Sequence, residues 1–189
     1  MYGQNAEQIM TITAKSRSYV EYLPDPQILF PNSKFNSKIK IKIDEGATVL
    51  ISDSFLTHDP SFQNKVPDLY QSEIIIDDGQ GKTLAIDRLN IENWAFQTCT
   101  PGILGDYKAH GTFILASQDP LAPLIHTMSH AIGDGLPKIA MGVSLLPNST
   151  GVIFRILAAD GIQLRKALHA CWSLIRKYYK GSEPIIRKK

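Results

Sequence analysis

Residues 18–59 read SYVEYLPDPQILFPNSKFNSKIKIKIDEGATVLISDSFLTHD, and this stretch indicates a protein built mainly of β-strands. In Lys38–Ile43, lysine and isoleucine alternate strictly, so one face of that strand meets water and the other meets a core. The turn Asp44–Glu45–Gly46 predicts a hairpin to an apolar strand, Thr48–Phe55. Earlier, Pro24–Asp25–Pro26 predicts a rigid corner between two strands, because proline fixes its own backbone and extends the residue before it.

Short β-like segments continue on both sides of this stretch. Alternating or β-branched runs predict further strands at 8–13, 19–23, 28–30, 72–76, 83–90, 91–98, 112–116, 138–145 and 151–158. Turn residues at 77–81 and 147–150 predict two hairpins. Such a succession favours a mostly β fold, either β-helix-like or a layered all-β scaffold.

Two segments have helical periodicity instead. The first, about 119–133, begins with an Asp–Pro pair suited to a helix start and ends at a glycine. The second, about 160–180, carries an apolar stripe with basic residues off it and stops at Gly181. We therefore expect one domain over residues 1–189 that is mostly β and has two α-helices.

The composition is that of an ordinary globular protein, with 189 residues, 43% hydrophobic and 20% charged. No run approaches the roughly 18 apolar residues of a spanning helix, and the N-terminus lacks the features of a secretion signal, so we expect a cytoplasmic protein without a membrane partner. Cys99 and Cys171 are interpreted as reduced core residues. The basic C-terminal part lacks interleaved aromatic residues, so it predicts a solvated or protein-docking surface and no nucleic acid partner.

The sequence contains no specific catalytic motif: it has no Gly-rich phosphate loop, no metal-binding cysteine pair and no G-x-S-x-G elbow. His126 and His130 are one helical turn apart, but no Glu or Cys accompanies them, so we interpret them as surface or packing residues. We predict that the protein is not an enzyme. A minor alternative is a hydrolase with paired carboxylates such as Glu21 and Asp53, which requires a separation of roughly 5–9 Å.

Asp53 and Asp87 stand out because each lies at or near the end of an apolar strand. A carboxylate that points inward there is costly unless it is paired or hydrated. Arg88 and Arg155 are candidate partners for structural ion pairs. Alternatively, the carboxylates line a water-filled passage or a metal path, because carboxylate oxygen accepts divalent ions. Glu21 raises the same question with less force.

Several segments, in the right order over nearly the whole chain, resemble the urease accessory protein family UreD, also called UreH. They are VEYLP (20–24), ILF (28–30), ISD (51–53), LAIDRL (84–89), VIFRIL (152–157), and the C-terminal helix with Trp172 followed by KGSEP (180–184).

The resemblance implies a non-catalytic urease maturation factor, a chaperone that takes part in nickel insertion and metallocentre assembly. Members of the family are all-β scaffolds with two helices that bind apo-urease and recruit a helical accessory protein. Through that protein they engage a nickel-carrying GTPase. Nickel reaches the urease active site through an internal tunnel lined with acidic groups. Transient nickel binding is therefore implied, and a tightly bound cofactor is not.

By position, the resemblance implies that Asp53 and Asp87 belong to that passage, with Glu21 as a weaker third candidate. It places the C-terminal strand and helix near the helical accessory protein. The candidate partner-binding residues there are Arg155, Trp172, Arg176 and Lys177. An alternative function that the residues leave open is a β-sandwich module for a small ligand or glycan.

The chain also departs from the family pattern. The family carries an N-terminal portion with a Gly-Gly-Asp segment upstream of the residues that match Met1 and Tyr2, so we expect the N-terminal part of the family fold to be missing. LTHDP at 56–60 replaces a Gly-Arg pair, and the ending at 187–189 lacks a Pro-Arg-Ile-Trp-like finish. Missing strands would leave a sheet edge exposed.

Overall fold

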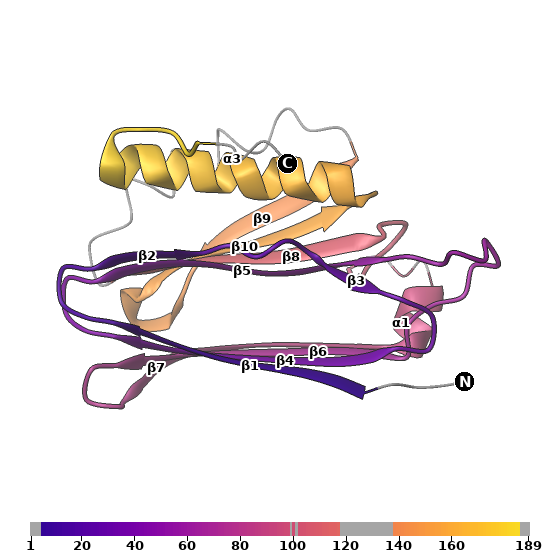
Figure 1. Cartoon of the computed structure of the whole chain (residues 1–189), viewed down its shortest axis with the longest axis horizontal. Helices are drawn as coiled ribbons and strands as arrows, with labels where there is room; N and C mark the ends of the chain where they lie inside the picture. Colours follow the sequence, from indigo (N-terminus) through magenta and orange to yellow (C-terminus); the bar gives the residue numbers. More distant parts are fainter. Residues whose placement is uncertain (1–4, 99, 101, 118–137, 186–189) are drawn as a thin grey trace.

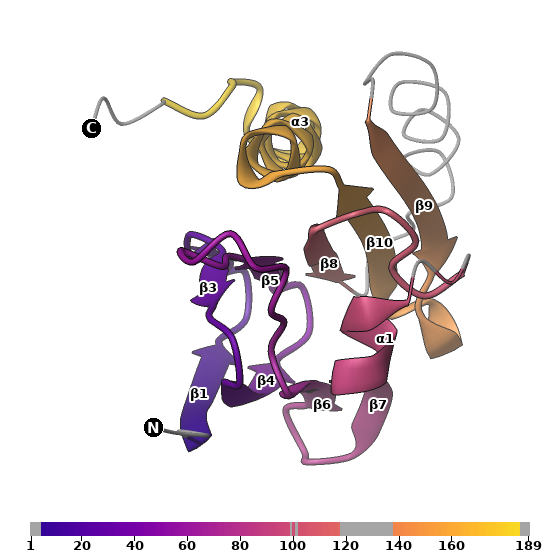
Figure 2. The ribbon, with the colours of Figure 1, turned by 90° about the vertical axis from the view of Figure 1, so that its right-hand side faces the viewer.

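The computed structural model stacks three layers: helix α3, a six-stranded middle sheet and a four-stranded outer sheet (Figures 1 and 2). It describes residues 5–98, 100, 102–117 and 138–185. The prediction of a mostly β, layered scaffold is confirmed. The helix predicted at 119–133, together with His126 and His130, lies outside the described residues.

The outer sheet runs in the order β1-β4-β6-β7, with bounds β1 (Asn5–Ala14), β4 (Lys34–Ile43), β6 (Leu69–Asp78) and β7 (Thr83–Glu92). The middle sheet runs in the order β2-β5-β8-β10-β9, with β3 also paired to β5. Its strands are β2 (Tyr19–Tyr22), β3 (Gln27–Leu29), β5 (Thr48–Thr57), β8 (Ala109–Ser117), β9 (Ile139–Leu145) and β10 (Gly151–Ala158). The described helices are α1 (Asn93–Gln97), the 3-10 turn η1 (Pro147–Ser149) and α3 (Gly161–Lys180).

The chain winds between the two sheets as a β-helix does. It passes from β1 in the outer sheet to β2 and β3 in the middle sheet, then to β4, β5 and β6 alternately. Strands β1, β4 and β6 are parallel, and β2 and β3 run parallel to β5. The hairpin predicted at Asp44–Glu45–Gly46 is therefore wrong, because this turn connects β4 to β5 in the other layer.

The burial of β4 and β5 shows why they belong to different layers. Strand β4 alternates exposed or half-buried polar residues with buried isoleucines, as predicted, because only one of its faces is covered. In β5 all residues from Thr48 to Phe55 are buried. The outer sheet covers one face of β5 and the α3 layer covers the other (Figure 1).

The Pro24–Asp25–Pro26 segment does not turn a corner between layers. It separates β2 from β3, which both pair with β5, and the register with β5 shifts by one residue across it. Because proline has no backbone N–H, this segment interrupts the ladder beside Ser52–Ser54 of β5.

The strand predicted at 91–98 is also wrong, because β7 ends at Glu92 and α1 follows. Asn93 holds the start of this helix, since its Nδ2 donates to the Pro67 carbonyl at 3.2 Å and its Oδ1 accepts from Gln97 Nε2 at 2.8 Å. Ala95 is buried in an apolar cluster at this end of the sheets. The hairpins predicted at 77–81 and 147–150 are confirmed as β6–β7 and β9–β10.

Helix α3 confirms the prediction for 160–180. Asp160 caps its start by accepting from the backbone N–H of Gln163 at 2.8 Å. Gly181 ends it in the left-handed conformation at φ 67°. The apolar stripe of α3 packs on the middle sheet through the buried residues Leu164, Ala167, Cys171 and Ile175.

Two apolar clusters fill the space between the sheets. One contains Ile39, Ile41, Ile74, Ile51, Ile114 and their neighbours. The other contains Phe55, Tyr70, Ile91, Leu29 and Leu104. Polar and charged side chains lie between these two clusters, and they form the candidate site.

Candidate functional site

A polar layer crosses the interior between the two sheets. Asp53, Thr112 and Arg155 are paired in register across β5, β8 and β10, so their side chains share one face of the middle sheet. Ser72 of β6 and Asp87 of β7 face them from the outer sheet. We use the term polar layer for these five residues.

Hydrogen bonds and an ion pair join the sheets through the polar layer. The Ser72 hydroxyl donates to Asp53 Oδ2, and Arg155 Nη2 donates to Asp87 Oδ1. Arg155 Nη1 donates to Thr112 Oγ1 at 2.7 Å. The Arg155 guanidinium thus contacts one of the two carboxylates, Asp87, while Asp53 lies close enough for its charge to act on Asp87.

The pKa values of neighbouring groups reflect this charge distribution. Burial raises the pKa of Asp87, the Arg155 guanidinium opposes that effect, and the charge of Asp53 adds to it. Burial and the nearby Asp53 also raise the pKa of Tyr70 well above its ordinary value. Burial, with a contribution from Arg155, lowers the pKa of His110 to about 3, so this imidazole is neutral at physiological pH.

Two buried polar atoms beside the layer have no hydrogen-bond partner in the described part of the chain. They are Ser37 Oγ and His110 Nδ1. Ser37 is in register with Ser72, and His110 precedes Thr112 by two residues on β8, so each shares a face with a member of the layer. Such atoms commonly mark places where water or an ion completes the bonding.

The structure brings Asp53 and Asp87 together. Each follows an apolar run and lies within its strand, because β5 continues to Thr57 and β7 to Glu92. Of the two candidate partners, Arg155 pairs with Asp87. Arg88 points to the opposite face of the outer sheet, where its Nε lies 2.7 Å from Glu73 Oε2.

Glu21 lies away from the polar layer. It is in register with Leu50, which packs under α3, so it occupies the opposite face of the middle sheet from Asp53. Arg176 Nη1 donates to Glu21 Oε2 at 2.6 Å, and the Tyr19 hydroxyl donates to Oε1 at 2.9 Å. Burial raises the pKa of Glu21, but hydrogen bonds outweigh it and the net pKa is lowered. Glu21 and Asp53 therefore do not face a common cleft, as a hydrolase would require.

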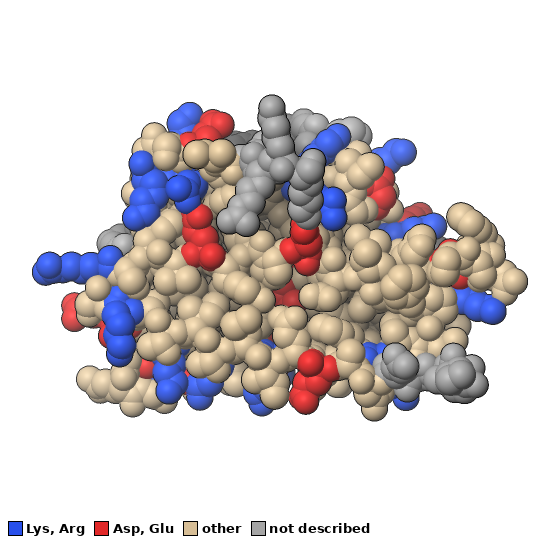
Figure 3. Space-filling view, viewed as in Figure 1, with Lys and Arg blue, Asp and Glu red and all other residues tan. Residues whose placement is uncertain are grey.

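The candidate partner-binding residues occupy three different settings. Arg155 belongs to the polar layer. Trp172 packs partly against the core under α3, and Arg176 reaches Glu21. Lys177 is exposed. Figure 3 shows the face of the molecule that is viewed in Figure 1. Basic side chains lie along its α3 side and along the outer sheet, and the surface between them is mostly uncharged with a few acidic side chains.

The described residues contain no preformed metal site, because they include no group of three or more His, Cys, Asp or Glu side chains that could hold an ion. In the same residues, no helix has both the length and the apolar character needed to cross a membrane.

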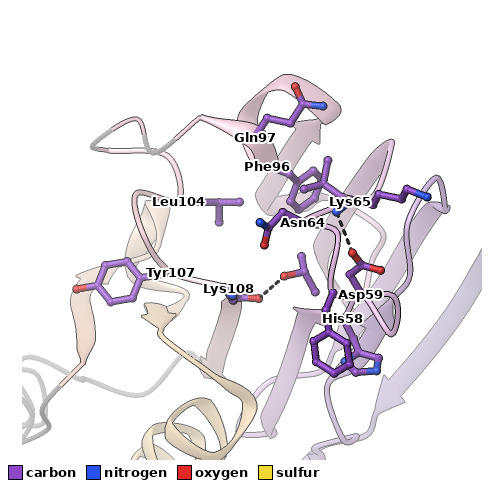
Figure 4. A pocket seen from close by; sticks show the side chains of 12 residues that line it. His58, Asp59, Asn64, Lys65, Phe96, Gln97, Leu104, Tyr107 and Lys108 are labelled. Carbon is purple, nitrogen blue, oxygen red and sulfur yellow. Dashed lines mark hydrogen bonds between the residues drawn. The ribbon is translucent and has the colours of Figure 1, made fainter.

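A separate pocket of about 570 Å³ lies where the loop after β5 meets the segment that follows α1 (Figure 4). Phe62, Phe96 and Tyr107 supply aromatic surface, and Lys65 and Lys108 supply positive charge. Its size is that of a small-molecule pocket. This pocket could not be predicted from the sequence, because residues 58–69 have the composition of a plain loop.

Asp59 holds this loop in shape. Its carboxylate accepts the Ser61 hydroxyl at 2.6 Å and the backbone N–H groups of Gln63 and Lys65 at 2.9 and 3.0 Å. The hydrogen bond from Ser61 is the main cause that lowers the pKa of Asp59 to about 2. The carboxylate is thus engaged by the loop itself.

The chain matches one family model, described as UreD urease accessory protein, over residues 1–188. Curated proteins with the same description are similar along the whole chain. A urease accessory protein UreD 1 of Pseudomonas syringae pv. syringae is 36% identical over 190 residues, which cover 100% of this chain and 66% of that protein. A second, from Pseudomonas syringae pv. tomato, is 35% identical with the same coverage.

More distant relatives have the same description. A urease accessory protein UreD of Photorhabdus laumondii is 28% identical over 98% of this chain and 60% of its own length. The chain thus spans about two thirds or less of the length of these relatives.

Proposed function

Because this chain belongs to the UreD family of urease accessory proteins, we propose that it is a non-catalytic scaffold that binds apo-urease and helps to deliver nickel to its active site. Family membership supports a role in urease maturation. The passage of nickel, the partners and a cytoplasmic location are parts of the proposal.

The observation that carries the proposal is the polar layer. Two carboxylates, Asp53 and Asp87, lie between apolar clusters in the interior, where uncompensated charge is costly. A purely structural core gains little from such groups, since apolar residues of similar volume often give equal stability. Two carboxylates and few further ligands suit weak, transient handling of nickel, because an ion in transit must also leave.

The partner surface in this proposal is the exposed side of α3. Arg176 and Trp172 fix the helix on the middle sheet, whereas Lys177 and other basic side chains face outward. This side would bind the helical accessory protein, which in turn engages the nickel-carrying GTPase.

Co-purification tests the scaffold. The tagged chain is expressed with urease subunits and the helical accessory protein, and the expected result is retention of both. If neither is retained, the scaffold proposal fails, and a ligand-binding module that uses the pocket near Asp59 becomes the better hypothesis.

The double variant Asp53→Ala with Asp87→Ala tests the passage. We expect urease activation to fall while partner binding persists. Glu73→Gln, which removes a charge from the outer face of the outer sheet, is the matched control and should leave activation unchanged. Loss of complex formation in the double variant would make the two acids structural and contradict a role in nickel transfer.

A further inference from the structure

Arg155 occupies the position that a cation would need in the polar layer. Its guanidinium lies against Asp87 and Thr112, in the same register row as Asp53. While it is there, its positive charge neutralises Asp87, and an arriving divalent ion meets a like charge beside Asp53. With the guanidinium removed, the two negative charges match a divalent ion.

The Arg155 side chain can reach solvent from its position in the polar layer. It is 38% exposed, whereas that of Asp87 is 14% exposed, so the guanidinium lies at the solvent side of the pair. The next residue in the register row is Gly142 of β9. A Cβ atom placed on Gly142 would have no atom of the described residues within 4 Å, so the space beside Arg155 is open with respect to them.

We propose that Arg155 is a gate for the cation path: its side chain swings outward over Gly142 and exposes Asp53 and Asp87 to nickel. This inference rests on the proposed function, because nickel is taken as the cargo. The inference gives Arg155 control over the access of the cation to the two carboxylates. The sequence suggested Arg155 only as an ion-pair or partner-binding residue.

Two buried atoms without hydrogen-bond partners in the described chain favour a cation path through the polar layer rather than a permanently closed ion pair. Ser37 Oγ and His110 Nδ1 are buried beside the layer from opposite sheets, and no hydrogen bond within the described chain satisfies either atom. A ligand or water that enters when Arg155 leaves would find these atoms ready to bond.

The gate makes opposite predictions for two variants. Arg155→Gln removes the blocking charge, so nickel should bind at least about tenfold more tightly than to the unaltered chain. Gly142→Ile fills the open space, holds Arg155 inside and should weaken nickel binding. Isoleucine suits a strand, and a Cβ atom at position 142 meets no atom of the described residues within 4 Å, so this variant should fold.

The readout is NMR of the whole chain titrated with Ni²⁺ alone at pH 7.5. Paramagnetic nickel broadens nearby amide signals even when it binds weakly, and the signals of Ser72 and Thr112 report on the polar layer. Arg155→Gln combined with Asp87→Asn should lose the gained binding. Arg88→Gln, which removes the same charge from the opposite face of the outer sheet, is the matched control and should behave like the unaltered chain.

The gate is overturned if Arg155→Gln shows no more broadening than Arg88→Gln. Should Arg155→Gln fail to fold, Gly142→Ile decides: nickel binding equal to that of the unaltered chain overturns the gate. Neither result depends on urease, so a failed gate leaves the scaffold proposal standing. A failed co-purification with a working gate would leave a metal path without its proposed partner.

Discussion

Arg155 on β10 and Asp87 on β7 form an ion pair across the space between the two sheets. The pair joins the strand that precedes α3 to the last strand of the outer sheet. It therefore holds the two layers together at the same place where it fills the polar layer.

Removal of one partner of this pair should destabilise the fold. We expect Asp87→Ala to lower the free energy of unfolding by about 1 kcal/mol, because it removes the counter-ion of a guanidinium that is partly exposed to water. Urea denaturation measures the change. A double-mutant cycle with Arg155→Ala should give a coupling of about 1 kcal/mol, and a coupling near zero would contradict the interaction.

The contact between Glu21 and Arg176 should stabilise the packing of α3 on the middle sheet in a pH-dependent way. We expect Arg176→Met to lower the free energy of unfolding by about 1 kcal/mol at pH 7. Because the pKa of Glu21 in the fold is lowered, its contribution is present above the ordinary value of 4.5 and is lost as the pH falls through the lowered pKa. The effect of the variant should shrink over that window. Lys177→Met, at the exposed neighbouring position, is the control and should change stability little.

His110 should make the protein sensitive to acid. Its pKa falls from 6.5 to about 3 on folding, so its contribution to stability is complete above pH 6.5 and is lost as the pH falls toward 3. His110→Phe, which keeps the ring contact with Phe55, should remove this part of the pH dependence. Denaturation between pH 7 and 4 tests it, and His58→Gln at the surface should keep the original dependence.

Two glycines in neighbouring strands should respond oppositely to alanine. Gly151 has φ 153°, and a Cβ there would lie 2.1 Å from the Leu115 carbonyl oxygen. We expect Gly151→Ala to cost about 3 kcal/mol or more, through strain and displaced backbone. Gly142→Ala should change stability by less than about 0.5 kcal/mol, because its Cβ meets open space. Thermal unfolding of both variants compares them, and similar losses would contradict the described packing.

Periodicity predicted the elements well where one physical pattern dominates. The lysine and isoleucine alternation of β4 fits only a strand with one buried face. The capped apolar stripe of α3 likewise fits only a helix packed on a core. Periodicity and turn residues were not enough to assign the strands to the two sheets. A turn such as 44–46 suits a hairpin and an arch between sheets equally, and the decisive sign was the unbroken apolar character of Thr48–Ile51, which indicates burial on both faces.

The candidate site was predictable only in its charged members. Asp53, Asp87 and Arg155 attract attention because charge in an apolar strand is unusual. Ser72 and Thr112 are common residues in strands. Their role follows from the register between β5 and β8 and from the way the outer sheet places β6 opposite β5, which a single sequence does not show. Glu21 has similar surroundings in sequence, yet strand alternation places it on the other face.

The winding of the chain between the sheets has a consequence for synthesis at the ribosome. Among the described strands, β1 pairs with β4, whose residues follow their partners by 29 positions, and β4 gains its second neighbour only with β6. Each new coil can settle on the one before it, so the outer sheet grows in the order of translation. The middle sheet grows differently: β5 can pair with β2 and β3 as soon as it emerges, but its other neighbour, β8, comes later, and β10 comes later still. The polar layer is therefore completed late in synthesis, when β10 brings Arg155 beside Asp87 and Thr112 and only α3 among the described elements remains to be placed.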